Sequence, residues 1–302
     1  MLSVGLIGSR GFMGSAFLPA LTQASHQGKL RLVLLHRPGS DTSSFPENVE
    51  KRMIDLAKGD VEDIARSVEG LNVVISAITG RNGGHQLQIP LIDALASSKD
   101  LLIFFPSEYA TPFRQEDLDR SEFLRRMTCG KAAIIAHAKE RKVPVTILKN
   151  ATVPFLLFSW DGAKFRPKEN SLKLYSPRGD GTRGLTSKDF SGAALVHLLL
   201  DRPETLPNAT ISLVEHSFSS QLLVDTFTKI HGRRPDIIET TEEDYQRGIK
   251  EDGFGSMGAA SDKSLSVGVD WPGETIDSES LSRTGRWDTK SFEDYVRESL
   301  DN

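Results

Sequence analysis

The sequence predicts an α/β fold in which a doubly wound parallel sheet is joined to a smaller C-terminal domain. Three observations support this prediction. Short apolar runs alternate with helix-like segments through the first half of the chain, a glycine-rich turn follows the first apolar run, and the alternation stops after Asn150. A chain of 302 residues accommodates one large domain or two modest ones.

The apolar runs are nearly continuous, which is typical of parallel strands that are covered on both faces. The predicted strands are Ser3–Ile7, Leu30–Leu35, Val73–Ala77, Leu101–Phe105 and Val145–Leu148. The predicted helices between them are Gly14–Ser25, Val61–Ser67, Gln86–Ala96 and Lys131–Arg141. Because crossovers in such a sheet are right-handed, ligands gather at the carboxyl ends of the strands.

After Asn150 the pattern changes, and proline, glycine and charged residues become frequent up to Gly184. A strand over Thr210–Val214 is expected to return to the sheet, whereas Asp252–Trp287 is rich in Gly, Ser and Asp and is expected to be loop-rich. Further helices are expected at Asp189–Leu200, Ser219–His231 and Ser291–Leu300.

Composition and charge argue against several classes of protein. The formal net charge of −4 offers no attraction for nucleic acid, and no apolar run approaches the length of a membrane span. The single cysteine, Cys129, suits a reducing compartment, and the histidines show no metal-binding spacing. We therefore expect a cytoplasmic monomer or homodimer that binds a small-molecule substrate without a metal, a nucleic acid or a membrane.

The segment from Val4 to Gly14 resembles a dinucleotide-binding turn, with its glycines in a G-x-x-G-x-x-G spacing. Gly8 would allow the tight turn, Gly11 would let the backbone approach a pyrophosphate, and Gly14 would let the helix pack on the strand. The N–H groups at the helix start would then hold the phosphates. The cofactor contacts expected in this loop are Gly8, Ser9, Arg10, Gly11, Phe12, Met13 and Gly14.

Arg37 follows the second predicted strand, where an acidic residue would favour NAD. Its planar cation suits the 2′-phosphate of NADPH, and Arg10 would be a second cation for the same phosphate. The alternative for Arg37 is an ordinary solvated loop residue. We therefore assign residues 1–150, with 186–215 returning to them, to an NADP-binding Rossmann domain, and residues 151–185 and 216–302 to a smaller substrate-binding region.

Several later segments resemble the isoflavone reductase-like proteins, which belong to the NmrA-like, atypical short-chain dehydrogenase group. Phe104–Tyr109 resembles their F-x-P-S-E-F segment, and Lys131 lies where the family has its active-site lysine, at the start of a helix. Lys149–Phe155 resembles the family's entry to the substrate pocket, and Ser187–Gly192 resembles its E-E-D-I-G segment. Further cofactor contacts are therefore expected at Ala77, Ile78, Ser107, Lys131, Asn150 and Thr152.

Lys131 heads an apolar helical stripe that continues through Ile134, Ile135 and Ala138. Burial and a helix N-terminus would both disfavour its positive charge, so that it could contact the nicotinamide ribose and transfer a substrate proton. Met127 stands where a Tyr-x-x-x-Lys pair would require tyrosine. The other candidate proton donor is Tyr109, for which packing is the stronger alternative, and Cys129 is expected to be a small buried hydrophobe.

Two segments are expected to close over the substrate, because apolar and aromatic linings suit hydrophobic ligands. Val153–Phe165 includes Phe155 and Phe158, and Gly253–Ala260 includes Phe254 and Met257 among glycines that would permit mobility. The alternatives are core packing for the first segment and an ordinary surface loop for the second.

The resemblance implies three functions. The first is an NADPH-dependent oxidoreductase of a hydrophobic, aromatic or secondary-metabolite small molecule, in which Lys131 assists proton transfer. The second is a redox-neutral cyclase or isomerase that uses the same pocket. The third is a non-catalytic regulator that senses NADPH. Lys131 on its apolar face favours an enzyme over a sensor.

Overall fold

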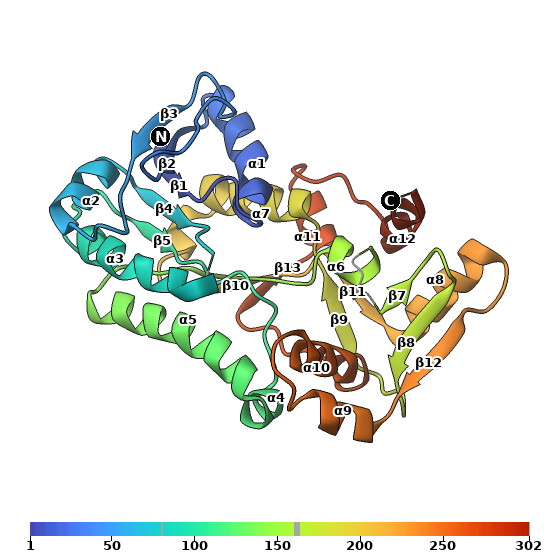
Figure 1. Ribbon diagram of the computed structural model, residues 1–302. Coiled ribbons are helices and arrows are strands. Elements are labelled where there is room, and N and C mark those ends of the chain that lie inside the picture. Colours follow the sequence, from blue (N-terminus) through green and yellow to red (C-terminus); the bar gives the residue numbers. More distant parts are fainter. Residues whose placement is uncertain (80, 160–163, 302) are drawn as a thin grey trace. The chain divides into compact units, whose positions relative to one another are not determined.

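The computed structural model describes residues 1–79, 81–159 and 164–301 (Figure 1). The chain forms two compact units. Unit 1 comprises Met1–Tyr109, Cys129–Leu148 and Lys188–Ile211, and unit 2 comprises Ala110–Thr128, Lys149–Ser187 and Ser212–Asn302. The expected first domain of residues 1–150 differs from unit 1 mainly in Ala110–Thr128, which folds with unit 2.

Unit 1 is built on a five-stranded sheet in the order β3-β2-β1-β4-β5, and its paired strands are all parallel. The strands are β1 (Leu2–Ile7), β2 (Leu30–His36), β3 (Glu50–Met53), β4 (Val73–Ser76) and β5 (Ile103–Phe105). A parallel bridge between Phe104 and Val145 extends the sheet beyond β5. The strand order reverses beside β1, which creates the switch point at which such sheets bind ligands. The predicted α/β fold with a parallel sheet is thus confirmed.

Helices cover both faces of this sheet (Figure 1). They are α1 (Gly14–His26), α2 (Val61–Val68), α3 (Gln88–Ala96), α5 (Glu122–Glu140) and α7 (Lys188–Asp201), with the short 3-10 helices Arg81–Leu87 and Pro203–Thr205. One hydrophobic core joins Ile64, Leu91 and Ile134 of α2, α3 and α5 to strand residues such as Val33 and Val74. The α1 and α7 helices pack closely against each other, because a Cβ at Gly192 would lie only 2.5 Å from the Ala16 carbonyl oxygen.

Unit 2 combines short strands with short helices. A sheet in the order β12-β8-β7 contains Asp236–Thr240, Ser171–Tyr175 and Phe165–Arg166, and β9 (Thr182–Leu185) pairs with β11 (His216–Ser219). The chain also forms a sheet in the order β13-β10-β6, which contains Glu274–Ile276, Thr210–Leu213 and Ile147–Asn150 and is not confined to the residue ranges of unit 2. The helices are α4 (Gln115–Arg120), α6 (Pro154–Phe158), α8 (Ser220–His231), α9 (Glu242–Gly248), α10 (Phe254–Val267), α11 (Ser278–Ser282) and α12 (Phe292–Asp301).

Two strand predictions were wrong in detail. The β10 strand pairs with β6 and β13 and does not rejoin the five-stranded sheet. The single strand expected at Val145–Leu148 is divided, because Val145 bridges Phe104 whereas β6 pairs with β10. Between them, the Thr146 hydroxyl donates to the carbonyl oxygen of Leu206 at 2.7 Å. The chain therefore changes sheets at Thr146.

The expected loop at Asp252–Trp287 was also wrong, since it contains α10, β13 and α11. The α10 helix begins after Gly253, whose φ of +66° lies in the left-handed region. Its small residues weaken the periodic signal, yet Ala259 and Ala260 are buried in a core with Tyr245. The glycines at the start of this segment thus permit close packing within a helix.

Candidate functional site

The glycine loop of unit 1 has the tight geometry that its spacing predicts. Gly8 has a φ of +79°, and a Cβ there would lie 2.6 Å from the Ala77 carbonyl oxygen. The Gly11 N–H donates to the Gly8 carbonyl at 2.9 Å. A Cβ at Gly14 would lie 2.0 Å from that same carbonyl oxygen, so only glycine lets α1 begin this close to β1. The loop lies directly against the end of β4.

The first turn of α1 is arranged as an anion site. Among the described residues, no side chain caps this helix at its N-cap residue Met13. Gly11 and Phe12 are exposed, whereas Ser9 is buried. An uncapped helix start with exposed backbone beside it suits a phosphate group.

The carboxyl end of β2 carries one predicted cation, Arg37, and the other, Arg10, lies near it. Arg37 is exposed. The Arg10 guanidinium lies 5.3 Å from the centre of the Phe45 ring, and the His36 ring meets the same ring edge-on at 6.3 Å. Phe45 therefore brings Arg10 to the strand end that carries Arg37.

The loops after β4 and β5 are joined by side-chain hydrogen bonds. The Ala77 N–H donates to the Ile7 carbonyl oxygen at 2.9 Å, which aligns the ends of β1 and β4. The Ser107 hydroxyl donates to the Ile78 carbonyl at 2.5 Å, and the Ser107 N–H donates to the buried Gln88 side chain at 2.9 Å. The structure thus brings the predicted contacts Ala77, Ile78 and Ser107 together at one edge of the sheet.

Tyr109 is held by packing and by a backbone acceptor. Its ring lies edge-on to Phe17 with centroids 5.2 Å apart, and its hydroxyl donates to the Ser76 carbonyl oxygen at 2.9 Å. Burial, with a smaller effect from the charge of Glu108, raises the pKa of Tyr109. A hydroxyl that is buried and already donating favours the packing role over proton transfer.

Lys131 forms an ion pair with Glu108, with 3.5 Å between Nζ and Oε2. The lysine side chain is 23% exposed and the carboxylate side chain 7% exposed. The apolar stripe is as predicted, since Ile134 and Ala138 are buried. The predicted helix start was wrong, however, because α5 begins at Glu122. Lys131 therefore lies away from the positive end of the helix dipole, and its electrostatic partner is a carboxylate.

The residues just before Lys131 are also closely packed. A Cβ at Gly130 would lie 2.3 Å from Nε2 of His85, so the imidazole rests directly on the glycine. Cys129 is exposed, which contradicts the expected buried hydrophobe. It lies on the side of α5 away from the apolar stripe.

Lys188 is a residue that the sequence interpretation missed. At the start of α7, its ammonium lies 3.1 Å from the Ser15 hydroxyl and 4.6 Å from the centre of the Phe12 ring. A third cation thus stands beside the glycine loop. The available signal was Ser187-Lys188-Asp189, where lysine replaces an acidic residue of the E-E-D segment that it resembles.

The predicted cofactor and substrate contacts in unit 2 range from buried to exposed. Asn150 is buried, and its carbonyl oxygen accepts a hydrogen bond from the Thr111 hydroxyl at 3.0 Å. Phe155 is 55% exposed and Phe254 is 61% exposed. The remaining aromatic and sulfur side chains are packed, with Phe158 in the core against Phe165 and Phe292, and Met257 against the core that contains Tyr245. Phe158 therefore fits the core-packing alternative, and Trp160, in the same segment, lies outside the described residues.

Thr152 adjoins a buried charged cluster made by Lys164, Arg183 and Asp262. Arg183 donates to the Thr152 hydroxyl at 3.2 Å, and the Lys164 ammonium pairs with Asp262 and donates to the Gly258 carbonyl at 2.9 Å. Burial lowers the pKa of Arg183 to about 10. Burial also raises the pKa of Asp262 and lowers that of Lys164, outweighing the attraction between them. The cluster ties α10 to the segment that precedes β7.

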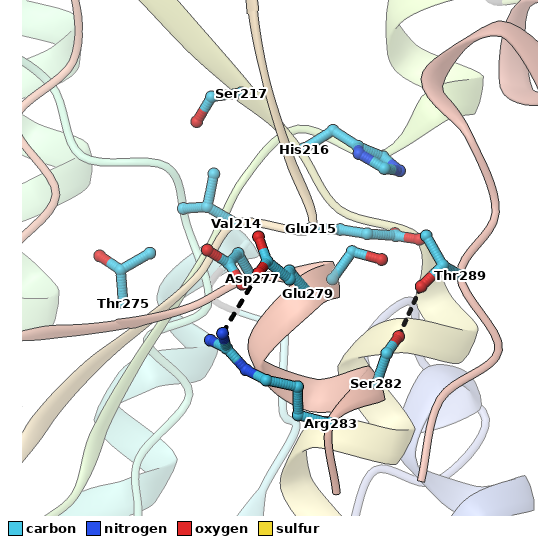
Figure 2. A pocket seen from close by; sticks show the side chains of 11 residues that line it. Val214, Glu215, His216, Ser217, Thr275, Asp277, Glu279, Ser282, Arg283 and Thr289 are labelled. Carbon is cyan, nitrogen blue, oxygen red and sulfur yellow. Dashed lines mark hydrogen bonds and ion pairs between the residues drawn. The ribbon is translucent and has the colours of Figure 1, made fainter. Parts of the chain in front are cut away.

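A cavity of about 660 Å³ opens elsewhere in unit 2 (Figure 2). Its lining residues are mostly of polar types: Val214, Glu215, His216, Ser217, Thr275, Asp277, Ser278, Glu279, Ser282, Arg283 and Thr289. Figure 2 shows Arg283 turned back onto Glu279 and Ser282 bonded to Thr289, so part of the lining is already paired. None of the predicted site residues lines this cavity.

Two further findings concern the described part of the chain only. None of its helices combines the length and the apolar character that crossing a membrane requires. It also contains no cluster of three or more His, Cys, Asp or Glu side chains placed to hold a metal ion.

The comparisons with known proteins agree with the resemblance that these motifs indicate. No family model matches the chain. The chain is 25% identical over 272 residues to the bifunctional pinoresinol-lariciresinol reductase of Forsythia intermedia, which covers 82% of this chain and 81% of that protein. Two solved structures share its fold. The first is AtPrR2 with NADP+ and (+)pinoresinol, which is 18% identical, has a TM-score of 0.76, and matches over 99% of this chain and 98% of its own. The second is isoflavone reductase, which is 19% identical, has a TM-score of 0.75, and matches over 98% of each chain. The chain is therefore similar in sequence to pinoresinol-lariciresinol reductase and shares its fold with AtPrR2 and isoflavone reductase.

Proposed function

We propose that this protein is an NADPH-dependent oxidoreductase that acts on a hydrophobic, aromatic small molecule, with Lys131 assisting proton transfer. The observation that carries the proposal is a series of contacts that joins the carboxyl ends of β1, β4 and β5. Gly8 touches Ala77, the Ile78 carbonyl accepts from Ser107, and the next residue, Glu108, pairs with Lys131. The glycine loop and the loop that carries Glu108, the ion-pair partner of Lys131, thus lie at the carboxyl ends of strands in one sheet, where α/β sheets bind ligands.

The residues of unit 1 fit NADPH. Gly8 and Gly14 leave no room for a Cβ, and the uncapped start of α1 offers N–H groups to a pyrophosphate. Arg37 and Arg10 would hold the 2′-phosphate, and Lys188 would add positive charge beside the loop. When bound, NADPH supplies a hydride.

Lys131 would manage the proton that accompanies this hydride. The substrate would gain a hydride at carbon and a proton at oxygen as the C=O π bond or the C–O single bond between those two atoms breaks. The Lys131 ammonium would donate that proton as negative charge develops on the oxygen. Solvent then restores the proton to the amine. Tyr109 is a weaker candidate, because its hydroxyl already donates to the Ser76 carbonyl.

The names of the relatives and the exposed aromatic residues support the proposed substrate class. The relatives include reductases of pinoresinol and lariciresinol and an isoflavone reductase, whose names indicate phenolic substrates. Phe155 and Phe254, which are largely exposed, remain the predicted substrate contacts, and Asn150 and Thr152 remain predicted cofactor contacts. Phe158 is not proposed, because it lies in the core.

Turnover of a phenolic panel tests the proposal. Pinoresinol, lariciresinol and an isoflavone are incubated with NADPH and either the wild type or Lys131→Met, while cofactor oxidation and product are followed separately. We expect a loss of about a hundredfold to ten-thousandfold in kcat for the variant, the usual contribution of a proton-transfer group. Lys139→Met, an exposed lysine on the same helix, serves as the control.

The other functions predict different results. Product formed without oxidation of NADPH would indicate a redox-neutral cyclase or isomerase. NADPH binding without turnover of any compound, with no effect of Lys131→Met, would indicate a sensor and contradict the proposal.

A further inference from the structure

Glu108 forms an ion pair with Lys131, and its role rests on the proposed function of that lysine. The Nζ to Oε2 distance is 3.5 Å. Glu108 is 5% exposed, so its charge acts where water screens it poorly.

The segment that carries Glu108 is fixed on both sides. The preceding Ser107 donates to the Ile78 carbonyl, and the following Tyr109 donates to the Ser76 carbonyl. The Glu108 N–H donates to the Pro106 carbonyl at 2.7 Å, which closes a tight turn. Because the neighbouring side chains are held by the end of β4, the Glu108 carboxylate has little freedom to move away from α5.

Lys131 is fixed on its own element. Its helix packs through Ile134 and Ala138 in the core of unit 1, and the imidazole of His85 rests on Gly130, the residue before it. The titratable groups His85 and Tyr109 also lie near the pair, because His85 rests on Gly130 and Tyr109 follows Glu108 in the chain. Glu108 supplies negative charge in this corner of the site.

We infer that Glu108 is the positioning residue of the active site: it orients the Lys131 side chain and keeps it protonated. An opposite charge at this distance favours the charged form of a lysine. The resting lysine is then an acid, ready to give a proton to a substrate oxygen that accumulates negative charge. The matching substrates are those whose reduction releases or forms a phenolate or an alkoxide, rather than those that must first lose a proton to a neutral amine.

Chemical labelling of Lys131 tests this inference without a substrate. Acetic anhydride reacts with neutral amines, so the acetylation rate of Lys131 at mildly alkaline pH, followed by mass spectrometry, reports its unprotonated fraction. We expect Glu108→Gln to raise this rate about tenfold, the ordinary effect of removing one nearby opposite charge. Lys139 in the same protein is the internal reference.

Two variants complete the experiment. Glu122→Gln removes an exposed carboxylate from the same helix and is expected to leave the labelling of Lys131 unchanged. Glu108→Asp keeps the negative charge but places it one methylene farther from Lys131, so we expect the acetylation rate of Lys131 to rise about two- to threefold. This variant replaces Glu108→Gln if the latter does not fold. Equal labelling rates in the wild type and the Glu108 variant would overturn the inference.

The result is separable from the proposed reductase activity. If no phenolic compound is turned over but the labelling responds to Glu108→Gln, the pairing is established and the reaction is not a reduction of that panel. If reduction occurs, Glu108→Gln is expected to lower kcat by about tenfold or more with little change in KM, and to shift the loss of activity in alkali to lower pH. Glu108→Asp should restore most of this activity.

Discussion

Arg37 is an exposed cation at the end of β2, and Arg10 approaches the same strand end over the ring of Phe45. We expect Arg37→Ala to weaken NADPH binding by about ten- to a hundredfold, because a charge-assisted hydrogen bond contributes roughly 1.5–3 kcal/mol. NADH binding should change little, and Arg37→Asp should reverse the preference. Fluorescence titration with both cofactors measures the two dissociation constants.

The matched control is Arg66→Ala, which removes an exposed arginine that pairs with Asp63 on α2. It should leave both affinities unchanged. An equal affinity of the wild type for NADPH and NADH would contradict the assignment of Arg37 to the 2′-phosphate.

For single residues, roles that depend on neighbours in the sequence were predictable, and contacts with residues far away in the sequence were not. The roles of Gly8 and Gly14 follow from their spacing, because the turn and the helix start lie within one short segment. Lys131 was identified from its apolar stripe and the family resemblance. Its partner Glu108 belongs to another loop, and only the packing of α5 on the sheet brings the two charges together.

Among the elements, α10 depends on the buried pair of Lys164 and Asp262. We expect Asp262→Asn to lower the free energy of unfolding by about 3 kcal/mol, because removing one partner of a buried pair leaves the other charge uncompensated. Arg183, which is also buried, would lose the same counter-charge. Urea denaturation of the wild type and the variant measures the difference.

Asp252→Asn provides a control, since Asp252 is an exposed partner of Arg126. It should cost at most about 1 kcal/mol, as exposed ion pairs contribute little. If Asp262→Asn also lowers the free energy of unfolding by less than about 1 kcal/mol, α10 does not depend on the buried pair.

Element boundaries were hard to predict where residue propensities oppose the tertiary structure. The α5 helix was expected at Lys131 but begins at Glu122, because Thr128, Cys129 and Gly130 are poor helix formers that the packing accommodates. Gly130 is required there by the ring of His85. The β3 strand is largely exposed and charged, so its sequence carries no strand signal, and it forms because β2 offers it a free edge.

For the whole molecule, Glu242 contributes to stability against acid. Hydrogen bonds from Tyr175 and Gln246, with Lys263 nearby, lower the pKa of Glu242 from 4.5 to about 2. A carboxylate with a lowered pKa in the folded state stabilises above its unfolded pKa, and this contribution is lost as the pH falls from 4.5 toward 2. The side chain is 50% exposed, so the contribution is at most about 1 kcal/mol.

We therefore expect Glu242→Gln to be less stable than the wild type near neutral pH, with a difference that shrinks as the pH falls and vanishes near the pKa of about 2. Urea denaturation over a series of pH values measures it. The adjacent exposed residue provides the control variant Glu243→Gln, which should show no such trend. A difference that is constant, or that grows in acid, would contradict this role.

The sequence by itself determined the class of the fold, the glycine loop and the resemblance to the isoflavone reductase-like proteins, because each depends on local patterns: alternating apolar runs, glycine spacing and short motifs. The tertiary structure decided the rest. It paired Glu108 with Lys131, placed Lys188 beside the loop, buried Phe158 in the core and made a helix of α10. These features depend on contacts between segments far apart in the chain, and their free energy arises only when the segments pack together.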